Sequence, residues 1–249
     1  MTTLEPADPF GPGIEITSRI GVELIQHVGD DVAIAAAARV STGGDVSMLG
    51  ADPNEVQGLL RYLMKHRHGS PWEHGSMTFR VHVPIFVMRE MQRHRIGVSF
   101  NEESGRYRTL DPTFWSPPAD RPIAVPAAYK PARPMFERGT FEQFDLIASH
   151  DRVLYDALYT AYEAEVNAGI AREVARRLLP VGLYTSAWVT CNPRSLMHFL
   201  SLRTHRSDAA YPSYPQREIE QVAEAMEAIF ATHWPITARL FDELGRVAP

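Results

Sequence analysis

The sequence predicts an α+β fold, an α/β core with flanking helices. Two segments have the pattern of strands: apolar and polar residues alternate over 76–83, and 183–190 is rich in strand-forming residues. Longer segments instead repeat apolar residues at helical spacing, and the two kinds of element are unevenly interleaved. A chain of 249 residues can bury one sizeable core. We therefore expect a single domain over 1–249, with a proline-rich connection at about 111–134.

The first elements expected are a strand and two helices. Residues 21–41 carry apolar residues at mixed spacing and a run of alanines, which predicts a short strand and then a helix near Asp31 to Val40. A second helix is expected over 54–65, where valine and leucine follow a helical period. The Asp-Pro-Asn before it supplies an N-terminal cap.

The alternating segment 76–83 predicts a half-buried strand, with one apolar and one polar face. Pro84 then fits the first turn of a helix, and apolar residues continue at helical spacing until Gly97. The triplet Arg93-His94-Arg95 is therefore expected in the last turn of this helix.

The second half begins with seven prolines between Asp111 and Pro134, which predict a long surface connection without regular structure. Helices are expected over 140–168 and 171–179, followed by the strand-like segment. Asn192-Pro193 then caps a helix that runs to about Arg203, and a last helix is expected over 218–244.

One order of elements occurs twice: strand, proline, helix and an arginine-rich end. It is present at 76–95 and again at 183–206, where the end reads Arg203-Thr204-His205-Arg206. Arg194 and His198, four residues apart, share one face of the second helix. The two ends could meet at one site.

Composition limits the classes of protein to consider. The net charge is −5, so a cluster of arginines is a local feature, which disfavours a general nucleic-acid partner. No apolar run approaches the ~18 residues of a membrane span, and the N-terminus lacks the pattern of a signal peptide. The single cysteine, Cys191, fits a reducing compartment. We expect a cytoplasmic protein with no membrane partner.

The densest polar segment runs from Arg93 to Tyr107 and contains three arginines, a histidine, two carboxylates and two serines. Arginine offers a planar fork of donors to phosphate, serine adds a hydroxyl, and glycine lets backbone amides approach a ligand. The segment therefore predicts a site for a phosphorylated small molecule. A solvated helix end followed by a polar loop is the alternative.

Two other chemistries were considered. His66-Arg67-His68 with Glu73-His74 could hold a metal, but the spacing matches no strong zinc signature, so we expect no metal site. Cys191 could be a nucleophile, but it lacks a base at a helpful spacing, and inert packing is expected instead. Neither a dinucleotide-binding glycine motif nor a Walker loop is present, so side chains must hold any phosphate.

Several motifs together carry a resemblance to a known family. Arg93-His94-Arg95, followed over 99–107 by Ser-Phe-Asn-Glu-Glu-Ser-Gly-Arg-Tyr, resembles the signature of flavin-dependent thymidylate synthase. The similarity extends to His-Gly-Ser-Pro-Trp-Glu-His at 68–74, Pro-Ile-Phe-Val at 84–87, Arg-Arg-Leu-Leu-Pro at 176–180 and the segment 192–203. These segments cover most of residues 60–110 and 170–205.

The resemblance implies reductive methylation of dUMP to dTMP. The one-carbon unit would come from methylenetetrahydrofolate and the reducing equivalents from NADPH through FAD, with no covalent enzyme nucleophile. It also implies a central α/β part flanked by helices, in a homotetramer whose active sites are shared between subunits. Two other functions are kept open: a nucleotide-binding regulator without turnover, and a nucleic-acid-binding protein.

Site residues carried over by motif position fall into three groups. Arg203 would be the catalytic residue, a cation beside the amide edge of the pyrimidine. FAD would be held by His68, Ser70, Arg93, His94, Arg95, Glu102, Asn192, Pro193, Arg194 and His198. The dUMP site would consist of Glu90, Met91, Gln92, Arg93, Glu102, Glu103, Ser104, Gly105, Arg106, Arg176 and Arg203.

The chain departs from the family pattern in three places. Ile96 to Glu103 is one residue longer than is most common, so the loop must bulge, and Gly97 would ease this. Glu90 stands where glutamine is common, and a carboxylate there needs a proton or an arginine partner such as Arg89 or Arg93. Tyr211-Pro-Ser-Tyr-Pro215 lengthens the segment after Arg203, which could reshape the folate side.

Overall fold

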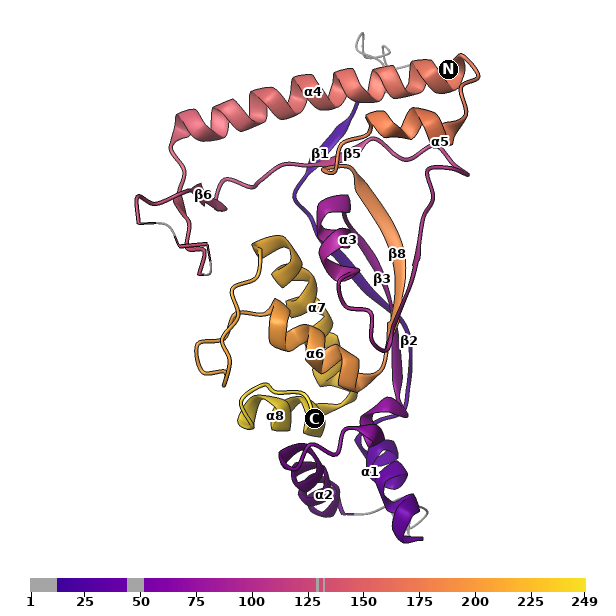
Figure 1. Ribbon diagram of the computed structural model, residues 1–249, viewed down its shortest axis with the longest axis vertical. Coiled ribbons are helices and arrows are strands. Elements are labelled where there is room, and N and C mark those ends of the chain that lie inside the picture. The colour runs from indigo at the N-terminus through magenta and orange to yellow at the C-terminus, as the bar shows by residue number, and fades with distance from the viewer. Residues whose placement is uncertain (1–12, 44–51, 129, 132) are drawn as a thin grey trace, which may run out of the picture. The chain divides into compact units, whose positions relative to one another are not determined.

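The computed structural model describes residues 13–43, 52–128, 130–131 and 133–249, and these fall into two compact units (Figure 1). The described part of the first unit consists of 13–19, 83–88, 103–128, 130–131 and 133–185, and that of the second of 20–43, 52–82, 89–102 and 186–249. Because the chain passes repeatedly between the two units, a single domain over 1–249 stays a proposal.

The second unit contains most of the main sheet, with strands in the order β2-β3-β8-β4. Strand β2 (Gly21–Val28) pairs antiparallel with β3 (Ser76–Pro84), and β4 (Val98–Glu102) pairs antiparallel with β8 (Tyr184–Cys191). The predicted alternation of β3 is confirmed, except that Thr78 on the polar face is buried. Its hydroxyl forms a hydrogen bond with that of Thr190 at 2.9 Å, which offsets the free-energy cost of burying the polar group.

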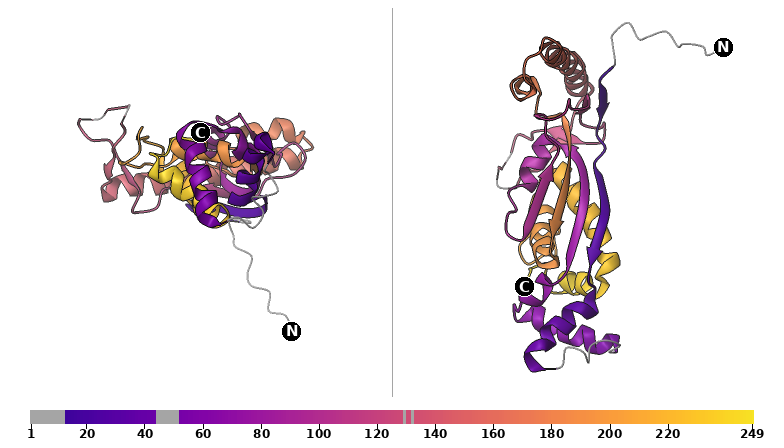
Figure 2. Two further views of the ribbon diagram at one scale, coloured as in Figure 1. Left: turned by 90° about the horizontal axis from the view of Figure 1, so that it is seen from below. Right: turned by 90° about the vertical axis from the view of Figure 1, so that its right-hand side faces the viewer.

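Helices α6 (Pro193–Arg203), α7 (Arg217–His233) and α8 (Pro235–Glu243) lie on one side of these strands (Figures 1 and 2). The start of α6 follows the predicted signals, because the Asn192 side chain accepts a hydrogen bond from Ser195 N at 2.8 Å and Pro193 occupies the first turn. Helices α1 (Asp31–Arg39) and α2 (Pro53–Lys65) complete the unit with two short turns, η1 (Val40–Thr42) and η3 (Ser70–Glu73).

A buried carboxylate joins α1 to α8. Asp31 accepts hydrogen bonds from the backbone N–H groups of Ile236 and Thr237, at 2.7 and 2.9 Å, and from the Thr237 hydroxyl at 2.6 Å. Burial raises the pKa of Asp31 despite these bonds. The Trp72 indole donates to the same hydroxyl at 3.1 Å. Asp31 thus satisfies donors at the N-terminus of α8 that lack partners within the helix.

We expect Asp31→Asn to lower the free energy of unfolding by about 1–3 kcal/mol, because an amide nitrogen would face a backbone donor in place of an acceptor. Urea unfolding of the variant measures this loss. Asp30→Asn is the control, because Asp30 caps the start of the same helix through Ala33 N and an asparagine keeps that cap. Equal midpoints for Asp31→Asn and the wild type would contradict the prediction.

The first unit packs helices on short strands. Strand β1 (Glu15–Thr17) pairs parallel with β5 (Thr113–Trp115), and β6 (Pro122–Ala124) pairs antiparallel with β7 (Glu137–Arg138). The 27-residue helix α4 (Phe141–Asn167) is followed by α5 (Arg172–Ala175) and the turn η4 (Arg176–Leu178). The core of this unit consists of Leu110, Phe114, Tyr159, Tyr162, Ala175 and Leu183.

The structure confirms the predicted α+β class and corrects four details. Helix α3 (Ile85–Met91) ends before Arg93-His94-Arg95, which lies in the turn that leads into β4. Strand β4 itself was not predicted, because we interpreted its residues as part of a polar loop. The proline-rich connection includes β5 and β6, and the predicted C-terminal helix is two helices, because Pro235 starts a new one.

Helix α4 has a largely exposed apolar face. Phe141 is 80% exposed, and Leu146 and Leu154 are more than half exposed, whereas Tyr159 and Tyr162 are buried.

Among the described residues, no helix has both the length and the apolar character that a membrane span requires.

Candidate active site

The two arginine-rich ends meet in the second unit, as the repeated order of elements predicts. Arg203, the last residue of α6, donates from Nε to His94 Nε2 at 3.0 Å. It also donates from one terminal nitrogen to the Glu90 carboxylate at 2.6 Å and from the other to the Glu90 carbonyl at 3.4 Å. The Arg203 side chain is only 19% exposed, so its fork is fixed in place and largely shielded from water.

His94 must be neutral to accept this bond, because a protonated imidazole has no acceptor. Burial, together with the charge of Arg203 and nearby His198, lowers the pKa of His94 to about 4. The ring also packs edge-on against Phe199, with centroids 4.9 Å apart. The imidazole is therefore a fixed neutral acceptor near pH 7.

The partner of Glu90 is Arg203, not Arg89 or Arg93. Burial raises the pKa of Glu90, the positive charge of Arg203 opposes that shift, and the charge of Glu218 adds to it. The carboxylate that is unusual for the family pattern therefore neutralises part of the charge of the predicted catalytic cation.

An open groove of about 620 Å³ lies beside this group. Three guanidinium groups line it, together with two imidazoles, an amide and the Glu73 carboxylate, and the guanidinium groups are donors suited to a diphosphate. Six of the predicted cofactor residues line the groove: Arg93, His94, Arg95, Asn192, Arg194 and His198.

Gly97 closes one wall of the groove. Its φ of +66° is in the left-handed region, and a Cβ there would lie 2.2 Å from Ser195 Oγ. Because β4 pairs with β8 in regular register from Val98 onward, the turn that contains Gly97 lies before β4. The expectation that Gly97 eases a bulge in this loop stays a prediction.

The other four predicted cofactor residues do not line this groove. Ser70 starts η3, which contacts α6, and a Cβ on the neighbouring Gly69 would lie 2.5 Å from Arg194 Nε. Pro193 is buried in the first turn of α6, and the His68 ring is tilted against that of Tyr62, with centroids 6.2 Å apart. Glu102, at the end of β4, accepts from Gln92 at 2.9 Å.

The remaining predicted dUMP residues are divided between the units. Glu90, Met91, Gln92, Arg93, Glu102 and Arg203 belong to the second unit, and Glu103, Ser104, Gly105, Arg106 and Arg176 to the first. Met91 is 2% exposed, so its side chain packs in the core and only its backbone is available to a ligand.

The residues of the first unit form a tight turn next to an exposed guanidinium group. Ser104 Oγ accepts from Arg106 N at 3.3 Å, and a Cβ on Gly105 would lie 3.4 Å from Cδ of Arg176. Within the described residues, the Arg176 guanidinium has no hydrogen-bond or ion-pair partner, whereas that of Arg106 is paired with Glu173 at 3.1 Å. A turn with a serine, a glycine and two arginines can hold a phosphate.

Sequence reasoning missed two carboxylates that pair with predicted site arginines, Arg194 and Arg106. Glu73 bonds Arg194 at 2.5 Å, and Glu173 pairs with Arg106. Glu73 lies inside the 68–74 motif, which was considered only for metal or flavin contacts, and Glu173 precedes the Arg176 motif by three residues. Among the described residues, no three acidic, histidine or cysteine side chains are arranged to hold a metal.

The family model described as Thymidylate synthase complementing protein, Thy1, matches residues 23–236. A flavin-dependent thymidylate synthase of Streptomyces coelicolor is 51% identical over 246 residues, 98% of this chain and 98% of that protein. The chain belongs to the flavin-dependent thymidylate synthase family. Another flavin-dependent thymidylate synthase, from Tropheryma whipplei strain TW08/27, is 49% identical and covers 93% of this chain and 96% of its own length.

Solved structures give the same result for the fold. The UMP/dUMP methylase PolB from Streptomyces cacaoi, bound with 5-Br UMP, superposes with a TM-score of 0.88 at 46% identity, over 96% of this chain and 100% of that one. The same enzyme bound with 5-Br dUMP gives a TM-score of 0.87. The expected α+β fold with a flavin-dependent thymidylate synthase-like architecture is therefore confirmed.

Membership in the flavin-dependent thymidylate synthase family agrees with the state of the cysteine. Cys191 is buried at the end of β8, and burial raises the pKa of its thiol to about 12. A thiol with so high a pKa is a poor nucleophile near neutral pH. The prediction of inert packing is confirmed.

Proposed function

We propose that the protein methylates dUMP to dTMP. Methylenetetrahydrofolate donates the one-carbon unit, and NADPH supplies the reducing equivalents through bound FAD. The observation that carries the proposal is the Arg203 guanidinium, held by a neutral His94 and by Glu90 where the two arginine-rich ends meet. The exposed apolar face of α4 supports a homotetramer with shared active sites. The expected cytoplasmic location stays a prediction.

In this proposal Arg203 polarises the pyrimidine. Carbon 5 of uracil attacks a methylene donor only when negative charge develops on the ring, and a fixed cation beside the amide edge stabilises that charge. His94 and Glu90 orient the guanidinium, so little reorganisation is needed when the charge appears. No covalent enzyme nucleophile takes part, in agreement with the buried Cys191.

The groove residues hold the cofactor in this proposal. Three arginines line it, one of which, Arg194, is itself held by Glu73, so the groove offers a fixed positive charge to a diphosphate. When bound, FAD supplies the hydride chemistry of the reduction. The protein contributes position and electrostatics.

Phosphate binding is assigned to the turn at Ser104, Gly105 and Arg106, together with Arg176. The unpartnered guanidinium of Arg176 is ready for an anion, and Arg106 exchanges its Glu173 partner for phosphate when the nucleotide binds.

The test is release of tritium from dUMP labelled at carbon 5, with FAD, NADPH and methylenetetrahydrofolate present. We expect release to require all three. Tight binding of dUMP without release would instead indicate a nucleotide-binding regulator. Failure of the purified protein to bind FAD on titration would exclude the proposal.

The ribonucleotide is a second candidate substrate, because the PolB structures are of a UMP/dUMP methylase with 5-Br UMP and with 5-Br dUMP. Methylation of UMP and dUMP in parallel, with each as competitor for the other, measures the preference. A kcat/KM for UMP above that for dUMP would reassign the substrate.

We expect Glu90→Gln to lower the dUMP concentration at half-saturation by roughly threefold to tenfold, or about 0.7–1.4 kcal/mol. The amide still accepts from Arg203, but a negative charge close to an anionic substrate is gone. Steady-state kinetics measure the change. Glu90→Ala is the comparison, because it also removes the acceptor that orients Arg203. A loss of turnover with Gln as large as with Ala would contradict this role and assign proton transfer to the carboxylate.

A further inference from the structure

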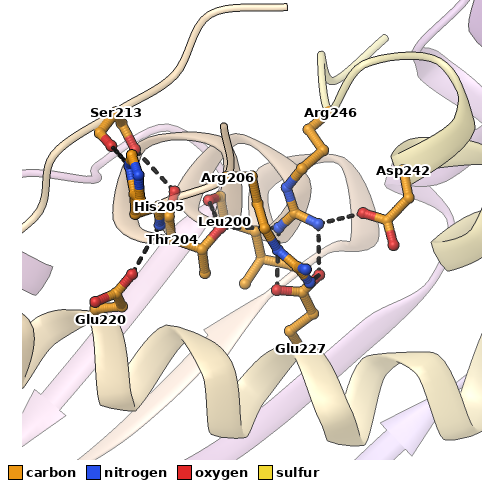
Figure 3. A network of polar contacts seen from close by, with 9 residues as sticks. All are labelled: Leu200, Thr204, His205, Arg206, Ser213, Glu220, Glu227, Asp242 and Arg246. Carbon is orange, nitrogen blue, oxygen red and sulfur yellow. Dashed lines mark hydrogen bonds and ion pairs between the residues drawn. The ribbon is translucent and has the colours of Figure 1, made fainter. Parts of the chain in front are cut away.

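The last residues of the second unit connect two parts of the proposed site. Arg246 is buried, with its side chain 4% exposed, and it has a left-handed backbone with φ of +58°. A residue other than glycine adopts this conformation at a cost, so it persists only where surrounding contacts hold it. Those contacts are shown in Figure 3, where the guanidinium lies among side chains from α6, α7 and α8.

The first of these contacts holds the end of α6. Arg246 donates to both oxygens of Glu227, at 2.6 and 3.0 Å, pairs with Asp242, and donates to Thr204 Oγ1 at 2.9 Å. The Thr204 hydroxyl in turn donates to the Leu200 carbonyl at 2.8 Å. Thr204 directly follows Arg203, so Arg246 fixes the backbone that presents the proposed catalytic cation.

The next residues are held by a second arginine in a left-handed conformation. Arg67, with φ of +61°, donates to the carbonyls of Val247 and Ala248 at 2.8 and 3.0 Å. Arg67 lies in the turn after α2 and immediately precedes His68, so these two bonds tie the tail to the turn that leads to Ser70.

The last residue of this segment contacts an arginine of the cofactor groove. Arg194 Nε donates to the backbone oxygen of Pro249 at 2.7 Å, while the other side of its fork bonds Glu73. Gly69 lies against both groups, since a Cβ there would be 2.5 Å from Arg194 Nε and 2.6 Å from the Pro249 oxygen. Arg194 is thus oriented from two sides before any ligand binds.

We infer that residues 246–249 are a brace that positions Arg194 for the cofactor and Arg203 for the pyrimidine. The residues of the brace act through these two arginines. The inference rests on the roles proposed above for Arg194 and Arg203. Its two arms make separate predictions, because residues 247–249 act on the groove and Arg246 acts on the end of α6.

The groove arm is tested with Arg67→Asn and with a chain shortened after Arg246. Asparagine tolerates the left-handed conformation, so the first variant removes the guanidinium without new backbone strain. We expect each change to raise the FAD dissociation constant by about tenfold. The two changes combined should still raise the dissociation constant by only about tenfold, because each acts by releasing residues 247–249 from Arg194. Arg239→Ala, which removes an exposed bond from α8 to Gln57 of α2, is the control.

Additive effects of about a hundredfold in the double variant would mean that Arg67 acts on FAD independently, and would overturn this arm. Unchanged FAD affinity in Arg67→Asn would also overturn it, and that variant decides the matter if the shortened chain does not fold. Thermal unfolding of each variant is measured in parallel. A stability loss without a change in FAD affinity would mean that the tail has only a structural role.

The α6 arm is tested with Thr204→Val, which keeps the shape but neither accepts from Arg246 nor donates to Leu200. We expect kcat to fall by roughly fivefold to tenfold with FAD affinity unchanged, and Thr204→Ser to restore it. A wild-type kcat in the valine variant would overturn this arm. Retention of turnover in Arg203→Ala would instead refute the proposed function, whereas the FAD measurements of the groove arm would stand.

Discussion

Replacing Arg203 by alanine is expected to lower kcat by about 100- to 1,000-fold while FAD stays bound. The guanidinium is the only group that reaches both His94 and Glu90 in the described part of the chain, and it is largely shielded from water. A preorganised cation in such a place stabilises developing charge more strongly than one in bulk water. Single-turnover kinetics with the reduced enzyme, beside FAD titration, measure the two quantities separately.

Arg203→Lys separates charge from geometry. Lysine keeps the positive charge but lacks the planar fork that donates to His94 and Glu90 from separate nitrogens, so we expect turnover between those of the alanine variant and the wild type. Arg80→Ala is the matched control, because Arg80 is an exposed arginine on β3 that pairs only with Glu23 among the described residues. Loss of FAD from Arg203→Ala would show that the residue serves the cofactor instead.

Local signals predicted the elements that carry these residues. An asparagine followed by proline marks the start of α6, and the structure has both the side-chain cap and the proline in the first turn. The length of this helix then determines where Arg203 lies. That Arg203 could lie close to the arginine-rich segment at 93–95 was therefore also predictable. The strands β3 and β8 were visible from apolar patterning alone.

Long-range partners could not be predicted in the same way. Glu90 and Arg203 are 113 residues apart, and Arg246 and Thr204 are 42 apart, so no spacing rule relates them. Strand β4 was missed because its residues also form the polar motif, and the assignment of that motif to a loop hid a weak alternation. The break between α7 and α8 was available from Pro235 and was overlooked.

Replacing Arg106 by alanine is expected to raise the dUMP concentration at half-saturation by about 10- to 100-fold with kcat little changed. Truncation removes a fork of donors from the phosphate, and the loss is the same in the ground state and the transition state, so it affects KM rather than kcat. Arg176 remains, which limits the loss. Steady-state kinetics with dUMP, compared with deoxyuridine as a substrate that lacks the phosphate, measure it.

Glu173 competes with the phosphate for Arg106, because its carboxylate accepts a hydrogen bond from Arg106 Nε at 3.1 Å in the free protein. Glu173→Gln should weaken that pair and release the guanidinium, so dUMP should bind equally well or up to about threefold tighter, within the range of an exposed ion pair. Arg152→Ala is the control, since Arg152 is an exposed arginine of α4 in the same unit and outside the proposed dUMP site. If Arg106→Ala left dUMP affinity unchanged, the phosphate would have to be held elsewhere. If deoxyuridine lost as much as dUMP, Arg106 would serve the turn rather than the phosphate.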